Sequence, residues 1–222
     1  MRRIVSVFAI TLALIIAARG SLLAENQVSL SLGGGAAFPV RGIRTMFRAG
    51  YEGTGVLEFP LNENFSLLLR GGYVHWQFNP AKINTAIAAL GGQTGVNVSG
   101  PFRAFPAMFG ARLTFSGTLL RPYVGGSGGA YFLHWTATGT SPAAGESQSG
   151  TYGGTWTEPA MSLDAGVLLS IGSGVSLDIA GIYTAMSNAD DRVEPADLFG
   201  VRIAGANTAS YVCVHAGVRV EL

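Results

Sequence analysis

The segment Tyr211–Leu222, YVCVHAGVRVEL, gives the clearest indication of the fold, because its apolar residues fall on every second position. Valine, alanine or leucine occupies each even-numbered position, whereas Cys213, His215, Arg219 and Glu221 occupy odd-numbered ones. Successive side chains of a β-strand point to opposite faces of the sheet. The alternation therefore predicts a strand with one apolar and one polar face.

The same two-residue period recurs in seven earlier segments. Together with the last strand they give eight expected strands, at 28–38, 47–59, 65–78, 105–115, 121–136, 160–171, 175–186 and 211–222. The faces are less distinct in 65–78, where three leucines are consecutive, and in the glycine-rich 121–136. The tripeptide at 172–174, Gly-Ser-Gly, predicts a tight hairpin between the sixth and seventh strands.

The composition excludes several classes of protein. Only 12% of the 222 residues are charged, about half the roughly 25% of a soluble domain. The formal net charge is +1, so a nucleic-acid partner is not expected. The apolar content also excludes a disordered chain. The single cysteine, Cys213, excludes an intramolecular disulfide and a cysteine-rich zinc site.

The N-terminus has the features of a cleaved secretory signal peptide. Two arginines precede an apolar run from Ile4 to Ala18, which is shorter than the roughly 20 residues of a membrane-spanning helix. Cleavage after Ala24 is the preferred site, and cleavage after Gly20 also satisfies the small-residue rule. The predicted organisation is a signal peptide at 1–24 and one barrel domain at 25–222.

No later stretch is apolar for long enough to form a transmembrane helix, yet the chain is apolar overall, with a mean hydropathy of +0.36. Lipid accommodates only helices and closed barrels, because every backbone polar group must be paired within the protein. We therefore predict an all-β fold, an eight-stranded antiparallel up-and-down transmembrane β-barrel. Connections 60–64, 116–120 and 172–174 are short, whereas 79–104, 137–159 and 187–210 are long, which predicts termini on the periplasmic side. A short helix is expected at 81–90, and 137–159 is expected to be a loop.

Charged residues fall almost entirely on the polar faces of these strands. An interior of eight strands is just wide enough for side chains, and buried charges are expected to pair. The predicted structural network that fills the lumen comprises Arg48, Glu52, Glu58, Arg70, Arg112, Asp164, Asp178, Arg219 and Glu221. Four aromatic residues near the outer strand ends are expected to form an interfacial girdle: Trp76, Phe78, Trp135 and Trp156.

Candidate catalytic and metal sites receive little support, and no catalytic residue, cofactor or metal is expected. His75, His134 and His215 are scattered over three strands, and only Thr136 offers His134 an evident hydroxyl on the same face. A lipid-modifying hydrolase or transferase and a small pore remain alternatives. The acidic loop at 190–197 offers oxygen ligands for calcium but lacks EF-hand spacing.

Three segments resemble the small outer-membrane β-barrel family, of the OmpA-like and OmpX-like kind. They are Arg121–Gly129 (RPYVGGSGG), the hairpin Leu163–Tyr183 and the closing strand Tyr211–Leu222. The chain departs from the family pattern in ending on Leu222 rather than on an aromatic residue. The resemblance implies a non-enzymatic protein of the bacterial outer membrane with a structural or surface-interaction role. Its implied partners are outer-membrane lipid, the barrel-insertion machinery and an unidentified ligand of the outer loops.

Overall fold

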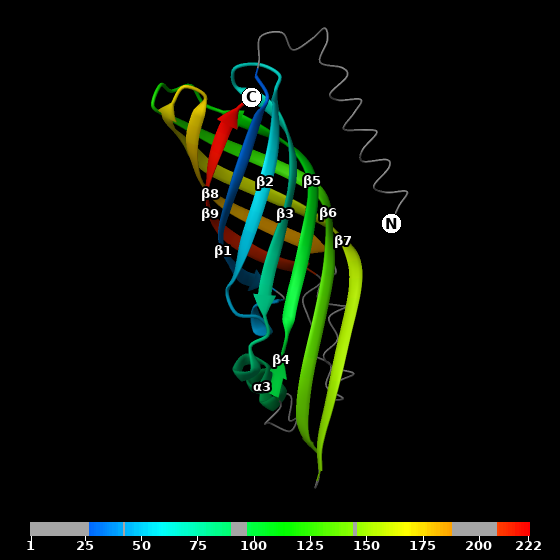
Figure 1. Ribbon diagram of the computed structural model, residues 1–222. Coiled ribbons are helices and arrows are strands. Elements are labelled where there is room, and N and C mark those ends of the chain that lie inside the picture. The colour runs from blue at the N-terminus through cyan, green and yellow to red at the C-terminus, as the bar shows by residue number, and fades with distance from the viewer. Residues whose placement is uncertain (1–26, 42, 90–96, 144–145, 188–207) are drawn as a thin grey trace.

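The structure is a computed structural model that describes residues 27–41, 43–89, 97–143, 146–187 and 208–222. Strands make up most of this part of the chain (Figure 1). They are β1 (Ser29–Arg41), β2 (Gly50–Pro60), β3 (Phe65–Gln77), β4 (Asn97–Ser99), β5 (Pro101–Thr114), β6 (Leu120–Ala143), β7 (Glu146–Gly172), β8 (Val175–Ser187) and β9 (Thr208–Glu221). The described helices are the 3-10 turn η1 (Ile43–Thr45) and α3 (Pro80–Ala89). No helix of the described ranges is long and apolar enough to cross a membrane.

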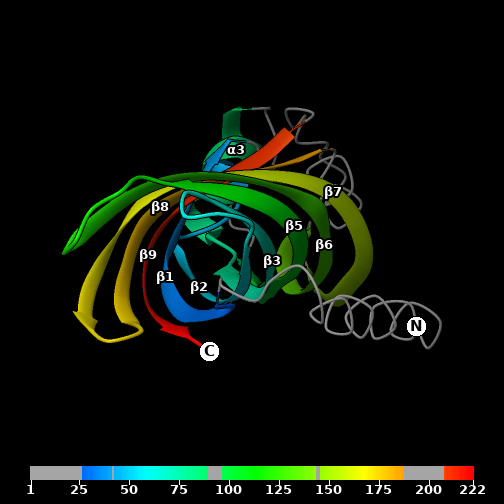
Figure 2. The ribbon, with the colours of Figure 1, turned by 90° about the horizontal axis from the view of Figure 1, so that it is seen from above.

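Eight of the strands close into a ring. Each pairs antiparallel with its neighbour in the order β1-β2-β3-β5-β6-β7-β8-β9, and β9 pairs back onto β1 (Figure 2). Ser29 lies opposite Glu221 at the closing pair, and the amide of Leu222 donates to the carbonyl of Val28 at 2.8 Å. The short β4 stands outside the ring order and pairs with β6 beyond the end of β5. The predicted eight-stranded antiparallel barrel is confirmed.

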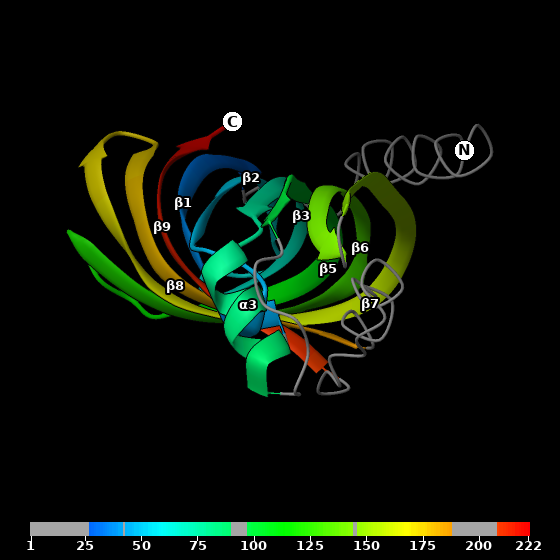
Figure 3. The ribbon, with the colours of Figure 1, turned by 90° about the horizontal axis from the view of Figure 1, so that it is seen from below.

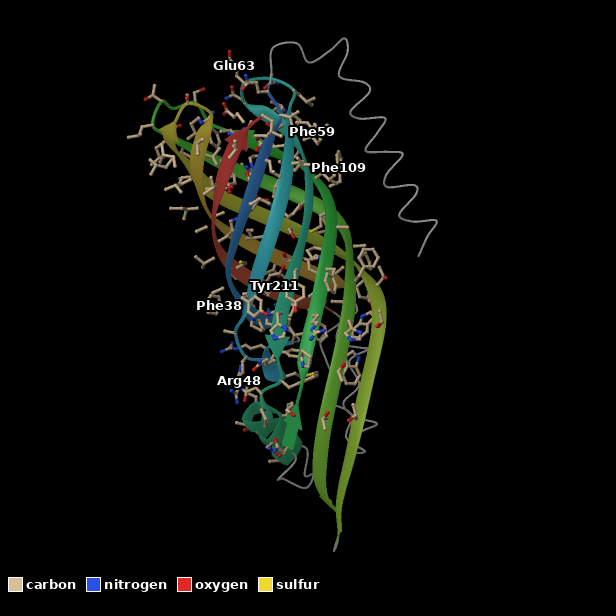
Figure 4. All side chains as sticks on the ribbon, viewed as in Figure 1. Phe38, Arg48, Phe59, Glu63, Phe109 and Tyr211 are labelled. Carbon is tan, nitrogen blue, oxygen red and sulfur yellow. The ribbon has the colours of Figure 1, made fainter. Side chains whose placement is uncertain are left out.

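The two strand faces that the alternation predicts form the inner and outer surfaces of the ring. In β8, Asp178 and Ile182 are buried, whereas Ile179 and Tyr183 on the other face are 50% and 41% exposed. The consecutive leucines of β3 divide in the same way, since Leu68 is buried and its two neighbours are partly exposed. Large apolar side chains such as Phe109, which is 58% exposed, cover the outside (Figure 4). A water-soluble monomer rarely exposes so continuous an apolar surface.

Short turns gather at one end of the ring and the larger connections at the other. The β2–β3, β5–β6 and β7–β8 turns lie at the end where the described chain begins and finishes, called here the terminal end (Figure 1). The β7–β8 turn is the predicted tight hairpin, with Gly174 at a positive φ of 74° that only glycine adopts without strain. Helix α3, which matches the helix expected at 81–90, lies at the opposite end, the loop end (Figure 3).

The β6–β7 hairpin differs from the sequence prediction. Residues 137–159 were expected to form a loop, but β6 and β7 remain paired as far as Ala143 and Glu146. The eight residues from Thr136 to Ala143 lie beyond the last pair that β6 makes with β5, which is a length of roughly 26 Å at about 3.3 Å per residue. Threonine favours strands, and the hydroxyls of Thr138 and Thr151 meet across the pair at 3.2 Å. A segment whose composition is typical of loops therefore forms paired strands that project from the ring.

Several predictions lie outside the described residues. These are the signal peptide at 1–24, the acidic stretch 190–197 and most of the long connection 187–210.

Candidate functional site

The terminal half of the lumen is organised around Arg112. This buried guanidinium of β5 contacts Glu58 at 3.1 Å, Asp164 at 3.6 Å and Asp178 at 4.0 Å. Its carbon Cζ also lies 3.9 Å from the ring centre of Tyr123, which is a cation–π geometry. Tyr123 in turn donates a hydrogen bond of 2.6 Å to Asp178. One arginine thus links three carboxylates and an aromatic ring.

Two further arginines complete this arrangement, called here the charge network. Arg70 contacts Asp164 at 3.1 Å. Arg219 contacts Glu58 at 3.4 Å and donates from Nε to the hydroxyl of Ser29 at 2.8 Å. The network contains three arginines and three carboxylates, so its formal charge is zero, and it draws on β2, β3, β5, β7, β8 and β9: Glu58, Arg70, Arg112, Asp164, Asp178 and Arg219.

Two glycines of the wall make room for these groups. A Cβ on Gly125 would lie 2.9 Å from the carboxylate oxygens of Asp164, and one on Gly166 would lie 2.7 Å from the Tyr123 hydroxyl. Real Cβ atoms do not approach other heavy atoms so closely. Gly125 of β6 and Gly166 of β7 therefore leave the space that the Asp164 carboxylate and the Tyr123 hydroxyl occupy.

The loop half of the lumen is filled by aromatic rings, called here the aromatic cluster. Trp76 packs against Tyr211 at 5.0 Å between ring centres and against Phe102 at 5.9 Å. Phe47 and Phe78, from the connections at the loop end, pack at 4.8 Å from one another. All five residues are at most 3% exposed. The label on Tyr211 in Figure 4 marks the level of this cluster within the barrel.

The expected aromatic girdle is therefore wrong. Trp76, Phe78 and Trp135 are buried, and Trp156 packs against the same buried cluster. Trp76 lies on the same face of β3 as Arg70, because the two are six residues apart and the strand period is two. These rings occupy the interior rather than the lipid boundary.

Hydroxyl and carboxylate groups join the two halves. The Tyr131 and Tyr211 hydroxyls meet at 2.8 Å, as do those of Ser162 and Thr184, and Thr54 donates to Glu52 at 2.8 Å. A cavity of about 10 Å³ beside Arg70 and Arg112 is the size of a single water site. At the terminal end lies a wider vestibule of about 270 Å³, whose lining includes Arg219 and Glu221. The described lumen is filled between the vestibule and the aromatic cluster.

The nine residues expected in the lumen lie in three different environments. Seven are buried inside the ring: Glu52, Glu58, Arg70, Arg112, Asp164, Asp178 and Arg219. Glu221 stands at the vestibule with its side chain 32% exposed, 3.7 Å from Arg121 and 3.8 Å from Arg219.

The prediction that Arg48 lies in the lumen is wrong, because Arg48 is exposed and precedes β2 (Figure 4). The chain leaves the sheet through η1 between Arg41 and Gly50, so the period-two rule does not apply to Arg48. The neighbouring Phe47, which the alternation of 47–59 places on the face opposite to Arg48, is fully buried in the aromatic cluster.

One lumenal acid was missed. Glu158 of β7 is 3% exposed and lies on the same face as Asp164. The signal was present in the sequence, because Glu158, Ala160, Ser162 and Asp164 share one parity. It was overlooked because this part of β7 was assigned to a loop.

A row of polar residues crosses the outside of the barrel near the loop end. Successive pairs place Tyr51 of β2 beside His75 of β3, His75 beside Arg103 of β5, Arg103 beside His134 of β6, and His134 beside Thr155 of β7. We call this row the outer ladder. Apart from the residues that end the strands, Arg103 is the one charged group among the described outward-facing side chains of the ring.

The histidines do not form a catalytic centre in the described part of the chain. His134 Nδ1 lies 2.9 Å from the Thr155 hydroxyl, not from Thr136, and the described side chains of the outward face include no carboxylate to orient it. His215 faces the lumen. No three of the described His, Cys, Asp and Glu residues are grouped as metal ligands.

The closed eight-stranded ring, with an apolar exterior and an interior filled by ion pairs and aromatic rings, has the fold of the small outer-membrane β-barrels. Neisserial surface protein A, a solved structure, matches with a TM-score of 0.51 and 12% identity, covering 88% of this chain and 97% of that one. A major outer membrane protein from Thermus thermophilus matches with a TM-score of 0.47 and 12% identity, over 88% of this chain and 99% of that one. The sequence matches no protein-family model and no curated protein. At 12% identity the first similarity establishes the fold.

Proposed function

We propose that this protein is a bacterial outer-membrane barrel with a closed lumen, which acts in envelope structure or surface interaction and not as an enzyme. The observation that carries the proposal is the inversion of polarity. The outside bears Met161 at 72% exposure, Leu163 at 64% and Phe109 at 58%, whereas the charge network lies inside. A hydrocarbon environment explains this distribution, because charge on a lipid-facing strand position costs about 2 to 4 kcal/mol at the midplane.

The lengths of the connections support a proposed orientation. Short turns characterise the periplasmic end of such barrels, so the terminal end is assigned to the periplasm and the loop end to the cell exterior. Export through a signal peptide at 1–24 and insertion by the barrel-insertion machinery complete this proposal.

The β6–β7 hairpin is the element best suited to surface interaction. It extends the ring by paired strands as far as Ala143 and Glu146 and carries exposed threonines, such as Thr138 and Thr151. A paired ribbon holds its side chains in fixed order, which lowers the entropy cost of binding. Its ligand is an unidentified molecule at the cell surface.

The first experiment is fractionation of cells that express the full chain, with gel mobility measured before and after boiling. We expect the protein in the outer-membrane fraction, with a folded band that shifts on heating. Recovery in the soluble fraction without a heat-dependent shift would contradict the proposal.

The closed lumen is tested by current across planar bilayers. We expect no large, steady conductance, because ion pairs and rings fill the lumen on both sides of Tyr131. Reproducible porin-sized currents from the monodisperse protein would support the pore alternative instead.

The enzyme alternative is tested at His134, whose 2.9 Å contact with the Thr155 hydroxyl places a base beside an aliphatic hydroxyl on the described outward face. We expect lipid A from cells that overexpress the wild type or a His134→Ala variant of equal abundance to have the same acyl-chain masses. A loss or gain of one chain that requires His134 would replace the non-enzymatic proposal.

A further inference from the structure

The outer ladder concentrates cationic and hydrogen-bonding groups at one level of an otherwise apolar exterior. Arg103 is exposed and forms no ion pair with any described residue, whereas the charge network pairs each of its arginines. Histidines stand on both adjacent strands, directly opposite Arg103 in register. Side chains directly opposite in neighbouring strands have Cβ atoms about 4.5 to 5.5 Å apart, so one small anion can reach all three residues.

We propose that the outer ladder binds the phosphate group of a phosphorylated lipid in the outer leaflet, with Arg103 as the central ligand. This inference rests on the proposed outer-membrane location. Arginine presents a planar fork of donors that matches phosphate oxygens in a bidentate geometry. An unpaired guanidinium at the edge of an apolar surface gains more from such an anion than one surrounded by water.

The two histidines are arranged so that each can donate a hydrogen bond to the phosphate. His134 Nδ1 lies 2.9 Å from the Thr155 hydroxyl, and His75 Nδ1 lies 3.3 Å from the Tyr73 hydroxyl. When each hydroxyl donates to Nδ1, the proton of the neutral imidazole resides on Nε2. Each ring then offers Nε2–H to the phosphate. Tyr51 stacks on His75 at 5.0 Å between ring centres and holds that ring in place.

The position along the strands favours a lipid over a free anion. Outward residues of β5 on the terminal side of Arg103 are apolar, with Phe105 at 45% and Phe109 at 58% exposure. Outward residues of β6 on the other side are the threonines Thr136 and Thr138. The ladder therefore marks the boundary between the apolar band and the polar hairpin. A lipid bound there places its phosphate on Arg103 and its acyl chains along the phenylalanines.

The test measures lipid binding by the refolded full chain in detergent, with native mass spectrometry as the readout. Three probes are compared: bisphosphorylated hexa-acyl lipid A, the same lipid with both phosphates removed, and inorganic phosphate. We expect bisphosphorylated lipid A to bind at least about tenfold more tightly than the other two, since phosphate and acyl chains contribute together.

Variants locate the binding. Arg103→Gln is expected to weaken binding of the phosphorylated lipid about tenfold and to leave the dephosphorylated lipid unaffected. Arg103→Lys keeps the charge but loses the fork, so an intermediate loss is expected. Arg48→Gln is the matched control, because it removes an exposed arginine at the same end that is not part of the ladder. It is expected to bind like the wild type.

The outcomes separate this inference from the proposed location. Each variant is first checked for a heat-shifted folded band, and Arg103→Lys replaces Arg103→Gln if the latter does not fold. Equal affinity for both lipids, or unchanged affinity in the folded Arg103 variant, would reject the site even if the protein fractionates with the outer membrane. Inorganic phosphate binding as tightly as lipid A would reject the lipid as its occupant. Recovery outside the outer membrane would reject the location instead.

Discussion

The two halves of the lumen fill the same eight-stranded ring by different means. The terminal half contains the charge network, in which each guanidinium lies within 4.0 Å of a carboxylate. The loop half contains the aromatic cluster, whose ring centres are about 5 to 6 Å apart, as between Trp76 and Tyr211 at 5.0 Å and between Trp76 and Phe102 at 5.9 Å. Ion pairs are directional and require every partner, whereas ring packing depends mainly on volume.

The two halves of the lumen should therefore respond differently to the loss of a single polar group. Removal of one charge leaves its partners buried and unpaired, which is costly. Removal of one hydroxyl from the aromatic cluster leaves its volume intact. Single polar changes should therefore have large effects in the terminal half and small ones in the loop half.

The largest effect is expected at the centre of the charge network. Arg112→Met leaves Glu58, Asp164 and Asp178 with two arginines in place of three. We expect a loss of about 3 to 5 kcal/mol in the free energy of unfolding, the usual cost of leaving a buried charge unpaired. Urea titration of the protein folded in lipid vesicles measures it. A change below about 1 kcal/mol would mean that the network relaxes around the gap.

The second prediction concerns the outer surface, which is expected to face lipid beside both halves of the lumen. Val214→Arg and Val218→Arg place a cation on the outward face of β9, where these valines are 58% and 42% exposed. Each should lose about 2 to 4 kcal/mol if it lies near the midplane, with lower folding yields in vesicles. Val214→Leu is the apolar control. Wild-type yields for both arginine variants would contradict the assignment of this face to lipid.

The third prediction isolates a polar contact within the aromatic half. Tyr211→Phe removes the 2.8 Å hydrogen bond to Tyr131 and keeps the ring. We expect about 0.5 to 1.5 kcal/mol of destabilisation by the same titration. Tyr183→Phe, on the outward face, should change stability by less than about 0.5 kcal/mol. An effect of Tyr211→Phe as large as that of Arg112→Met would remove the distinction between the halves.

The smallest effect is expected at the vestibule, where an ion pair beside the charge network is open to water. Arg121 and Glu221 are 3.7 Å apart, but their side chains are 28% and 32% exposed at the vestibule. Arg121→Met should cost at most about 1 kcal/mol, because exposed ion pairs contribute little. High salt should reduce this difference further. A cost equal to that of Arg112→Met would show that burial is not what distinguishes the two arginines.

The sequence predicted the ring and its two faces because period-two alternation is local information. It failed where the chain leaves the strand pattern, as at Arg48, which belongs to a connection through η1. It also failed where composition was given more weight than parity. Trp76 shares the parity of Arg70, and Glu158 shares that of Asp164. Following the alternation further would have placed both side chains inside.

Local sequence patterns could not predict which side chains pair within the site. Arg112 and Glu58 are separated by 54 residues, and Tyr131 and Tyr211 by 80. Which partners meet depends on ring closure and on the stagger of the strands. The outer ladder has the same origin, since its members come from five strands and become neighbours only through their registers.

The charge network also favours the correct alignment of the strands when the barrel assembles. A strand that slips by one residue turns every side chain to the other face. Such a slip in β7 would expose Asp164 to lipid and bring Leu163 inside, leaving Arg70 without its partner. Because the six charges come from six strands, a misregistered closure leaves at least one of them unmatched. The network therefore stabilises one alignment of the ring and penalises the misaligned closures.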